Sequence, residues 1–219
     1  MGKQKKTLPA LERRNYAFEV RAEGDEQAGA IITGRPIVYS SETDICGLFS
    51  EIIEPGALDG ADLSDVRFLV NHDKNKIPLA RSRKNSDTST MQLTVDGDGL
   101  AIRVELDTEN NSEARALYSA VKRGDISGMS FMFSIAEERW ENARTDYPKR
   151  HVEKIASVIE VSAVTFPAYE DTEINARGGA LESARGALES ARKTERGKQP
   201  EGGDALELAK QKILNMYRN

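Results

Sequence analysis

The sequence has a single cysteine and only two histidines, and this scarcity narrows the chemistry open to it. Cys46 cannot form an internal disulfide or a cysteine-based zinc site, and as a nucleophile it would need a nearby base. The two imidazoles, His72 and His151, do not show the His-Glu-x-x-His spacing of a zinc hydrolase. We therefore expect neither a metal nor a cofactor.

Long apolar runs and an excess of positive charge are also missing. No stretch approaches the roughly 18 apolar residues of a membrane span, so we expect no membrane association. The basic first residues lack the apolar core of a signal peptide, so we expect the chain to stay in the cytoplasm where it is made. The net charge of −5 argues against a general nucleic-acid binder. A soluble globular domain with polar extensions fits the 38% hydrophobic and 31% charged composition.

The character of the sequence changes along the chain and predicts four segments. Residues 1–14 are expected to be a flexible basic arm, and residues 15–175 the main domain. Residues 176–203 contain GALESAR twice, and glycine at each repeat start disfavours a helix, so they are expected to be a low-complexity linker. Residues 204–219 fit a C-terminal amphipathic helix, which would either dock on a partner or pack back on its own domain.

Within the main domain, most segments alternate apolar and polar residues as strands do. An apolar strand over 66–70 runs into Asn71-His72-Asp73, and the Asp-Gly-Asp-Gly of 96–99 indicates a hairpin. The polar stretch 137–150 looks like a second hairpin loop, followed by a long strand over 152–166. The pattern predicts an α+β or barrel-like fold.

One segment of the main domain is typical of a helix. Ser112 is a suitable N-cap, and Gly124 fits the position just after the last turn. Between them Ala114, Leu117 and Val121 lie three and four residues apart, which forms an apolar stripe.

Two polar residues stand out as candidates for hydrolytic chemistry. A serine hydrolase needs a base to take the hydroxyl proton, a group to orient that base, and donors for the oxyanion. His72 ends an apolar strand, where a side chain is held rigidly and still reaches solvent. Ser130 follows a small residue in Gly128-Met129-Ser130, although it lacks the second glycine of a Gly-x-Ser-x-Gly elbow.

The third member can be sought from hairpin geometry. If the strands around the polar loop pair antiparallel and turn near Thr145, opposed residues have numbers that sum to about 290. Ser130 would then face Glu160, about 5 Å away at Cβ. His151 would face Arg139, roughly 30 Å up the ladder. We expect Glu160 as the third member, with His151 as the alternative.

Several short motifs occur in an order that resembles the prohead protease family of tailed bacteriophages, which is similar in fold to the herpesvirus assemblin proteases. The resemblance covers about residues 28–176. The motifs are GRPIVYSS, EIIEPGAL at 51–58, Asn71-His72-Asp73, VKRGDISGMSFMF and EVSAVTFPAY at 160–169. The resemblance implies a β-barrel of about seven strands surrounded by helices, with a flexible C-terminal tail.

The resemblance also implies an activity. His72 would be the base and Ser130 the nucleophile of a serine endopeptidase, and in the viral relatives the third member is often a second histidine. Backbone N–H groups near 167–170 would form part of the oxyanion hole. Since Pro167 has no N–H, Ala168 or Tyr169 is expected there.

The implied biology is capsid maturation in the host cytoplasm. The enzyme would act inside the procapsid on scaffold protein or the scaffold-like arm of the major capsid protein, and finally on itself. A homodimer or higher oligomer is compatible with this role, and no nucleic acid is required. Two alternatives stay open: a non-catalytic assembly module on the same fold, and an unrelated β-rich binding domain.

Overall fold

The computed structural model describes residues 11–16, 20–23, 29–165 and 180–197, and these form an α+β fold that is mostly strand. No helix among the described residues is long and apolar enough to cross a membrane. The predicted C-terminal helix, residues 204–219, lies outside the described residues.

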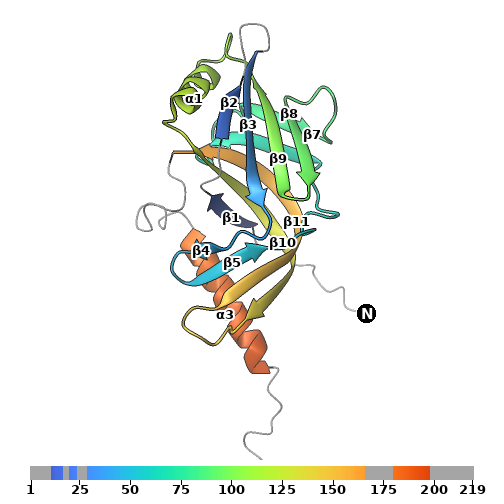
Figure 1. The fold of residues 1–219 in the computed structure, drawn as a ribbon, viewed down its shortest axis with the longest axis vertical. Coiled ribbons are helices and arrows are strands. Elements are labelled where there is room, and N and C mark those ends of the chain that lie inside the picture. The colour runs from blue at the N-terminus through green and yellow to red at the C-terminus, as the bar shows by residue number, and fades with distance from the viewer. Residues whose placement is uncertain (1–10, 17–19, 24–28, 166–179, 198–219) are drawn as a thin grey trace, which may run out of the picture.

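Two sheets make up the body of the molecule (Figure 1). The larger sheet has the order β1-β10-β11-β5-β4, and β6 also pairs with β11 and carries β7 on its other side. The smaller sheet has the order β2-β3-β9-β8. The strands of the larger sheet are β1 (Leu11–Tyr16), β4 (Thr43–Ile45), β5 (Phe49–Ile53), β6 (Asp65–Val70), β7 (Ala80–Arg83), β10 (Gly128–Glu141) and β11 (Lys149–Val164). Those of the smaller sheet are β2 (Val20–Glu23), β3 (Ala30–Val38), β8 (Met91–Asp96) and β9 (Gly99–Leu106).

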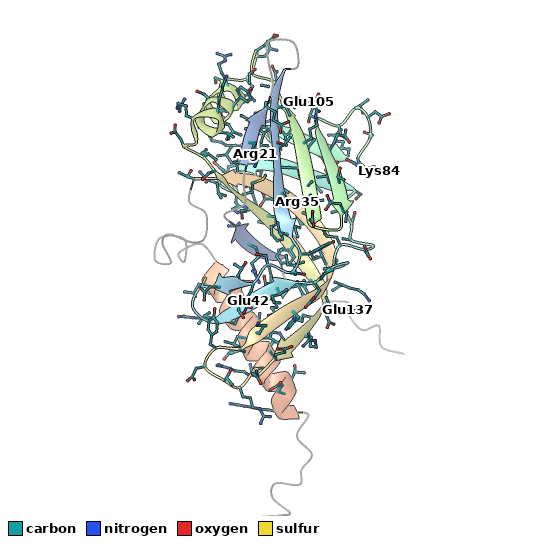
Figure 2. All side chains as sticks on the ribbon, viewed as in Figure 1. Arg21, Arg35, Glu42, Lys84, Glu105 and Glu137 are labelled. Atoms are coloured by element: carbon teal, nitrogen blue, oxygen red, sulfur yellow. The ribbon has the colours of Figure 1, made fainter. Side chains whose placement is uncertain are left out.

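The expectation of a closed, herpesvirus-type barrel is not confirmed. Closure requires the first and last strands of a sheet to pair. In the described part of the chain, β1 and β4 lie at opposite ends of the larger sheet and β2 and β8 at opposite ends of the smaller one, so both sheets are open. The main core combines side chains of both sheets, among them Phe68, Phe131 and Leu100. Charged side chains such as Lys84, Glu105 and Glu137 are exposed (Figure 2).

The predicted helix is present as α1 (Ser112–Arg123), which lies at the end of the molecule occupied by the smaller sheet (Figure 1). Its cap is one residue earlier than expected, because the Asn111 side chain accepts hydrogen bonds from the N–H groups of Glu113 and Ala114. Gly124 ends it in the left-handed conformation, with φ of 80°. The apolar stripe of Ala114, Leu117 and Val121 is buried, as predicted.

Strands β10 and β11 form the long antiparallel hairpin around which the larger sheet is built. The polar stretch 137–150 is less of a loop than predicted, because β10 continues to Glu141 and β11 begins at Lys149. Several of these polar residues form ion pairs that are compatible with strand structure. Arg139 pairs with Glu141 and Glu153, and Arg150 pairs with Glu12 of β1 and Glu51 of β5.

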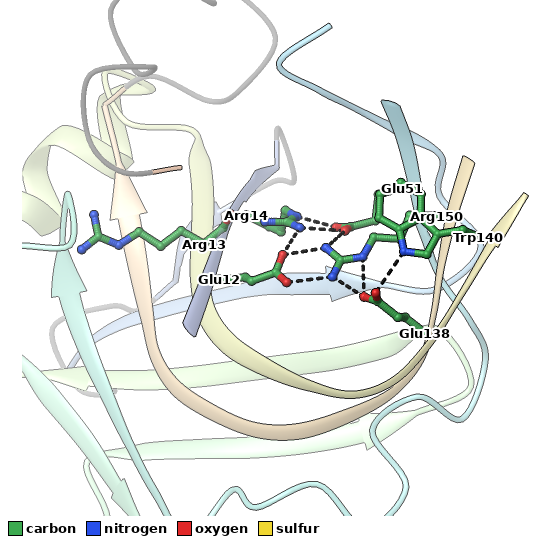
Figure 3. A network of polar contacts seen from close by, with 7 residues as sticks. All are labelled: Glu12, Arg13, Arg14, Glu51, Glu138, Trp140 and Arg150. Atoms are coloured by element: carbon green, nitrogen blue, oxygen red, sulfur yellow. Dashed lines mark hydrogen bonds and ion pairs between the residues drawn. The ribbon is translucent and has the colours of Figure 1, made fainter. Parts of the chain in front are cut away.

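Four residues of the predicted flexible arm belong to the sheet, which corrects the expected boundary at residue 14. Strand β1 pairs with β10, from Leu11 opposite Ser134 to Tyr16 opposite Met129. It is held by ion pairs that we call the ion-pair network, shown in Figure 3 and made of Glu12, Arg14, Glu51, Glu138 and Arg150. All of these residues except Glu138 are buried. This network was not predicted, because charged side chains usually face solvent.

The predicted linker is also partly wrong, because α3 (Ala180–Gly197) covers most of both GALESAR copies. The seven-residue period places Ala184, Leu188 and Ala191 on one face, and all three are buried. Ala184 and Leu188 pack on Phe49. This apolar contact offsets the cost of about 1 kcal/mol for Gly186 inside the helix.

Candidate active site

Three strands of the larger sheet bring Ser130, His72 and Glu160 together. Ser130 is near the start of β10 and lies opposite Ser162 of β11, and Glu160 is two residues before Ser162. Strand β6 runs parallel to β11 on the side away from β10, with Val70 opposite Ala163. The chain turns directly after Val70, so His72 comes back over the end of β11 towards Ser130.

The three side chains form a continuous line of hydrogen bonds. Nε2 of His72 lies 2.5 Å from the Ser130 hydroxyl, and Nδ1 of His72 contacts Oε1 of Glu160. Ser130 and Glu160 are buried, at 0% and 1% exposure, and the His72 side chain is 10% exposed. Low exposure matters here because electrostatic interactions between groups that are shielded from water are stronger.

The contacts of His72 determine which ring nitrogen carries the proton. A carboxylate only accepts hydrogen bonds, so the contact with Glu160 places the proton on Nδ1 and leaves the Nε2 lone pair facing Ser130. The Ser130 hydroxyl has a second acceptor, the main-chain carbonyl of Arg14 at 2.8 Å. With one proton to give, the hydroxyl donates fully either to His72 or to this carbonyl of β1.

The hairpin register differs from the predicted one near the site. Arg139 pairs with His151, as predicted, but Ser130 pairs with Ser162 rather than with Glu160. Register shifts between Met132 and Glu138 move the partner by two residues in total. Because a shift of two preserves the strand face, Glu160 still lies on the same face as Ser130, one diagonal position away.

His151 lies elsewhere. It pairs with Arg139 at the far end of the hairpin, and its Nδ1 is 2.5 Å from the Glu54 carboxylate. Its Nε2 is 3.2 Å from a carboxylate oxygen of Glu141. The structure therefore does not bring this alternative third member to Ser130.

Two further candidates are not part of the described site. The predicted oxyanion residues Ala168 and Tyr169 lie outside the described residues. Cys46 is half-buried, and burial raises the pKa of its thiol, which disfavours the reactive thiolate.

Ser162 was not predicted from the sequence, although it contacts both His72 and Glu160. Its hydroxyl donates to Oε2 of Glu160 at 2.7 Å and accepts from the His72 backbone N–H at 3.1 Å. The available signal was its spacing: a serine two residues after a strand carboxylate lies on the same face of that strand.

A hydroxyl, an imidazole and a carboxylate in one line, with the imidazole in the middle, is the arrangement of serine hydrolases. Residues 16–185 match the model of the caudovirus prohead serine protease family, and the chain belongs to that family.

One sequence relative agrees with the family match. The chain is 31% identical over 161 residues to the prohead protease of Enterobacteria phage HK97. The aligned region covers 72% of this chain and 64% of that protein. The chain thus spans less than two thirds of the length of this relative. A structure of the bacteriophage T4 capsid assembly protease covers 74% of this chain and 100% of its own, at 13% identity and a TM-score of 0.47.

Proposed function

We propose that this chain is a serine endopeptidase of phage head maturation, with Ser130 as nucleophile, His72 as general base and Glu160 as the group that orients His72. The observation that carries the proposal is the line of contacts in which Nε2 of His72 lies 2.5 Å from the Ser130 hydroxyl and Nδ1 contacts Glu160. Membership of the prohead serine protease family supports the same assignment.

The chemistry follows from the proton positions. His72 takes the hydroxyl proton on Nε2 as the oxygen of Ser130 attacks the scissile carbonyl. Glu160 stabilises the imidazolium that results, and His72 then gives the proton to the leaving amine as the peptide bond breaks. Water, deprotonated by His72, releases the acyl group from Ser130. We assign the oxyanion donors to the backbone N–H groups of Ala168 or Tyr169.

The substrates we propose are capsid components. The HK97 relative is named as a prohead protease, which supports a substrate in the assembling head. We propose the scaffold protein or the scaffold-like arm of the major capsid protein, and this chain itself, cleaved inside the procapsid in the host cytoplasm.

Coexpression with the capsid and scaffold proteins of the same phage tests this function. The wild-type chain should generate fragments whose new N-termini are readable by sequencing, and Ser130→Ala should generate none. A fluorophosphonate probe should label the wild-type chain at Ser130. Unchanged processing with Ser130→Ala would show that the chain is a non-catalytic assembly module.

A further inference from the structure

The Ser162 hydroxyl makes two hydrogen bonds, and both are to other groups of the protein. It lies on β11 directly opposite Ser130 and is 0% exposed. It has one proton, which it donates to Oε2 of Glu160 at 2.7 Å, and it accepts the His72 N–H at 3.1 Å. Its two hydrogen bonds therefore join it to His72 and Glu160, the proposed base and the residue proposed to orient that base.

These contacts close a ring of hydrogen bonds. One oxygen of the Glu160 carboxylate contacts Nδ1 of His72, and the other accepts from Ser162, which in turn accepts from the backbone of His72. Rotation of the carboxylate about its terminal torsion would break one of these bonds. That torsion is broad and weakly restrained by itself, so the second oxygen needs a partner if the first is to stay aimed at His72.

The backbone of the His72 turn also needs support. Asn71 and His72 have φ values of 51° and 57°, in the left-handed region that residues other than glycine rarely adopt. Such a conformation costs about 1 kcal/mol or more per residue and persists only where the surroundings hold it. Here β11 holds it, because Ala163 accepts the Asn71 N–H at 2.9 Å and Ser162 accepts the His72 N–H.

We propose that Ser162 is a positioning residue for the protease reaction. It fixes the plane of the Glu160 carboxylate and the backbone position of His72 at the same time, and it does not itself touch the substrate. The proposal rests on the proposed function of Ser130, His72 and Glu160. It predicts a loss in the chemical step and not in substrate binding.

Ser162→Ala tests the proposal in the full-length chain. With a capsid-derived peptide substrate, kcat should fall about 10- to 100-fold while KM stays within about twofold, as for loss of an interaction made in the transition state. In the wild-type chain the proton of the His72–Glu160 hydrogen bond should give a strongly deshielded NMR resonance, and in Ser162→Ala this resonance should broaden or disappear. Ser162→Thr keeps the hydroxyl and should retain kcat within a few-fold.

Ser134→Ala is the matched control. Ser134 is also buried on the same strand pair, and its hydroxyl lies 2.8 Å from that of Ser157 across the hairpin. Loss of this bond should leave kcat and the deshielded resonance unchanged. If Ser162→Ala is too unstable to assay, Ser162→Cys can replace it, because a thiol has a similar volume but is a weak donor. In that variant, too, kcat should fall while KM stays nearly unchanged.

The outcomes separate the two proposals. Cleavage that persists in Ser130→Ala would overturn the proposed function itself. If Ser130→Ala is inactive but Ser162→Ala has wild-type kcat, only the positioning role is overturned. An equal loss in Ser162→Ala and Ser134→Ala, or a rise in KM alone, would also overturn it, because the effect would then be one of general packing or binding.

Discussion

The larger sheet contains two buried polar clusters that differ in how their charges are satisfied. In the ion-pair network each guanidinium meets several carboxylates: Arg150 bonds to Glu12, Glu51 and Glu138, at 2.7 to 3.1 Å for Glu12 and Glu51. The cluster of Ser130, His72, Glu160 and Ser162, which we call the catalytic cluster after its proposed role, has one carboxylate in a chain of hydrogen bonds with an imidazole and two hydroxyls. In the network each carboxylate faces a guanidinium, whereas the catalytic cluster places a ring nitrogen of His72 beside a hydroxyl.

One sheet can therefore hold a cluster that stabilises the fold and a cluster suited to the proposed chemistry. Removing one partner from a dense set of buried charges leaves the others uncompensated, which costs stability. Removing a group from the catalytic cluster should instead interrupt the proposed proton transfer. The two clusters meet at β1, because the side chain of Arg14 belongs to the network and its carbonyl accepts from Ser130.

The largest expected effect is that of His72→Ala on activity. Without the base, kcat should fall by roughly 10⁴ to 10⁶, as in other hydrolases that lose a member of the triad. The free energy of unfolding should change by less than about 2 kcal/mol, because His72 lies in a turn beyond β6 and the Glu160 carboxylate keeps the hydrogen bond from Ser162. Peptide cleavage and urea denaturation measure the two quantities. A loss of stability greater than that of Arg150→Met would erase the contrast between the clusters.

Arg150→Met should have the opposite profile. It removes the central guanidinium and leaves the buried carboxylates of Glu12 and Glu51 with fewer partners, which should lower the free energy of unfolding by about 3–5 kcal/mol. Denaturant unfolding measures this. The control is Arg139→Met on the adjacent strand, where the guanidinium is exposed and pairs with Glu141 and Glu153. Equal stability of the two variants would show that the network contributes nothing beyond a surface ion pair.

Features that depend on local sequence could be predicted, and those that depend on packing between strands could be predicted only in part. The scarcity of histidines and the Gly128-Met129-Ser130 motif brought forward His72 and Ser130 as candidates, and the structure places these two side chains in contact. Helix α1 was predicted because its caps and apolar stripe are local signals. Glu160 was placed on the correct face with the wrong partner, since bulges in β10 and β11 are set by tertiary packing and not by local sequence.

The features that escaped prediction depend on contacts between distant segments. From the local sequence, Glu12 and Arg150 would be expected to face solvent. The pairing of β1 with β10 brings these two residues into contact although they lie 138 residues apart in the chain. The glycines of the GALESAR copies argued against a helix, and the apolar patch around Phe49 outweighed them in α3. Both are cases in which tertiary burial overrides local preference.

The network should also make stability depend on acid pH through Glu12. Burial alone would raise the pKa of this carboxyl, but Arg14 and Arg150 outweigh burial and lower the pKa from 4.5 to about 2. A group with a lower pKa in the folded chain contributes stability above its unfolded pKa and loses it as pH falls towards the folded value. The advantage of wild type over Glu12→Gln should therefore be about 3 kcal/mol at pH 7 and vanish between about pH 4.5 and 2.

Urea unfolding of wild type and Glu12→Gln at a series of pH values measures this difference. Taking the difference cancels the acid sensitivity of all other carboxyls, which both proteins share. A gap that stays constant down to pH 2 would mean that Glu12 contributes through packing and not through its charge.

The smallest expected effect concerns the turn that carries His72. Asn71 has a positive φ, and its side chain accepts the Thr165 N–H and donates to the Thr165 hydroxyl, both at 3.0 Å. Asn71→Ala should lower the free energy of unfolding by about 1–2 kcal/mol and kcat several-fold, because alanine resists the left-handed conformation and both bonds are lost.

Asn71→Gly separates the two contributions of this residue to the turn. Glycine adopts the positive φ without a steric cost but cannot bond to Thr165, so it should recover part of the stability that alanine loses. If the glycine variant recovers stability but not kcat, the contacts with Thr165 are what aim the His72 ring. If it recovers kcat as well, the backbone conformation alone places His72. A glycine variant worse than alanine in both measures would contradict this account, since the turn would then depend on a restricted backbone and not on relief of strain.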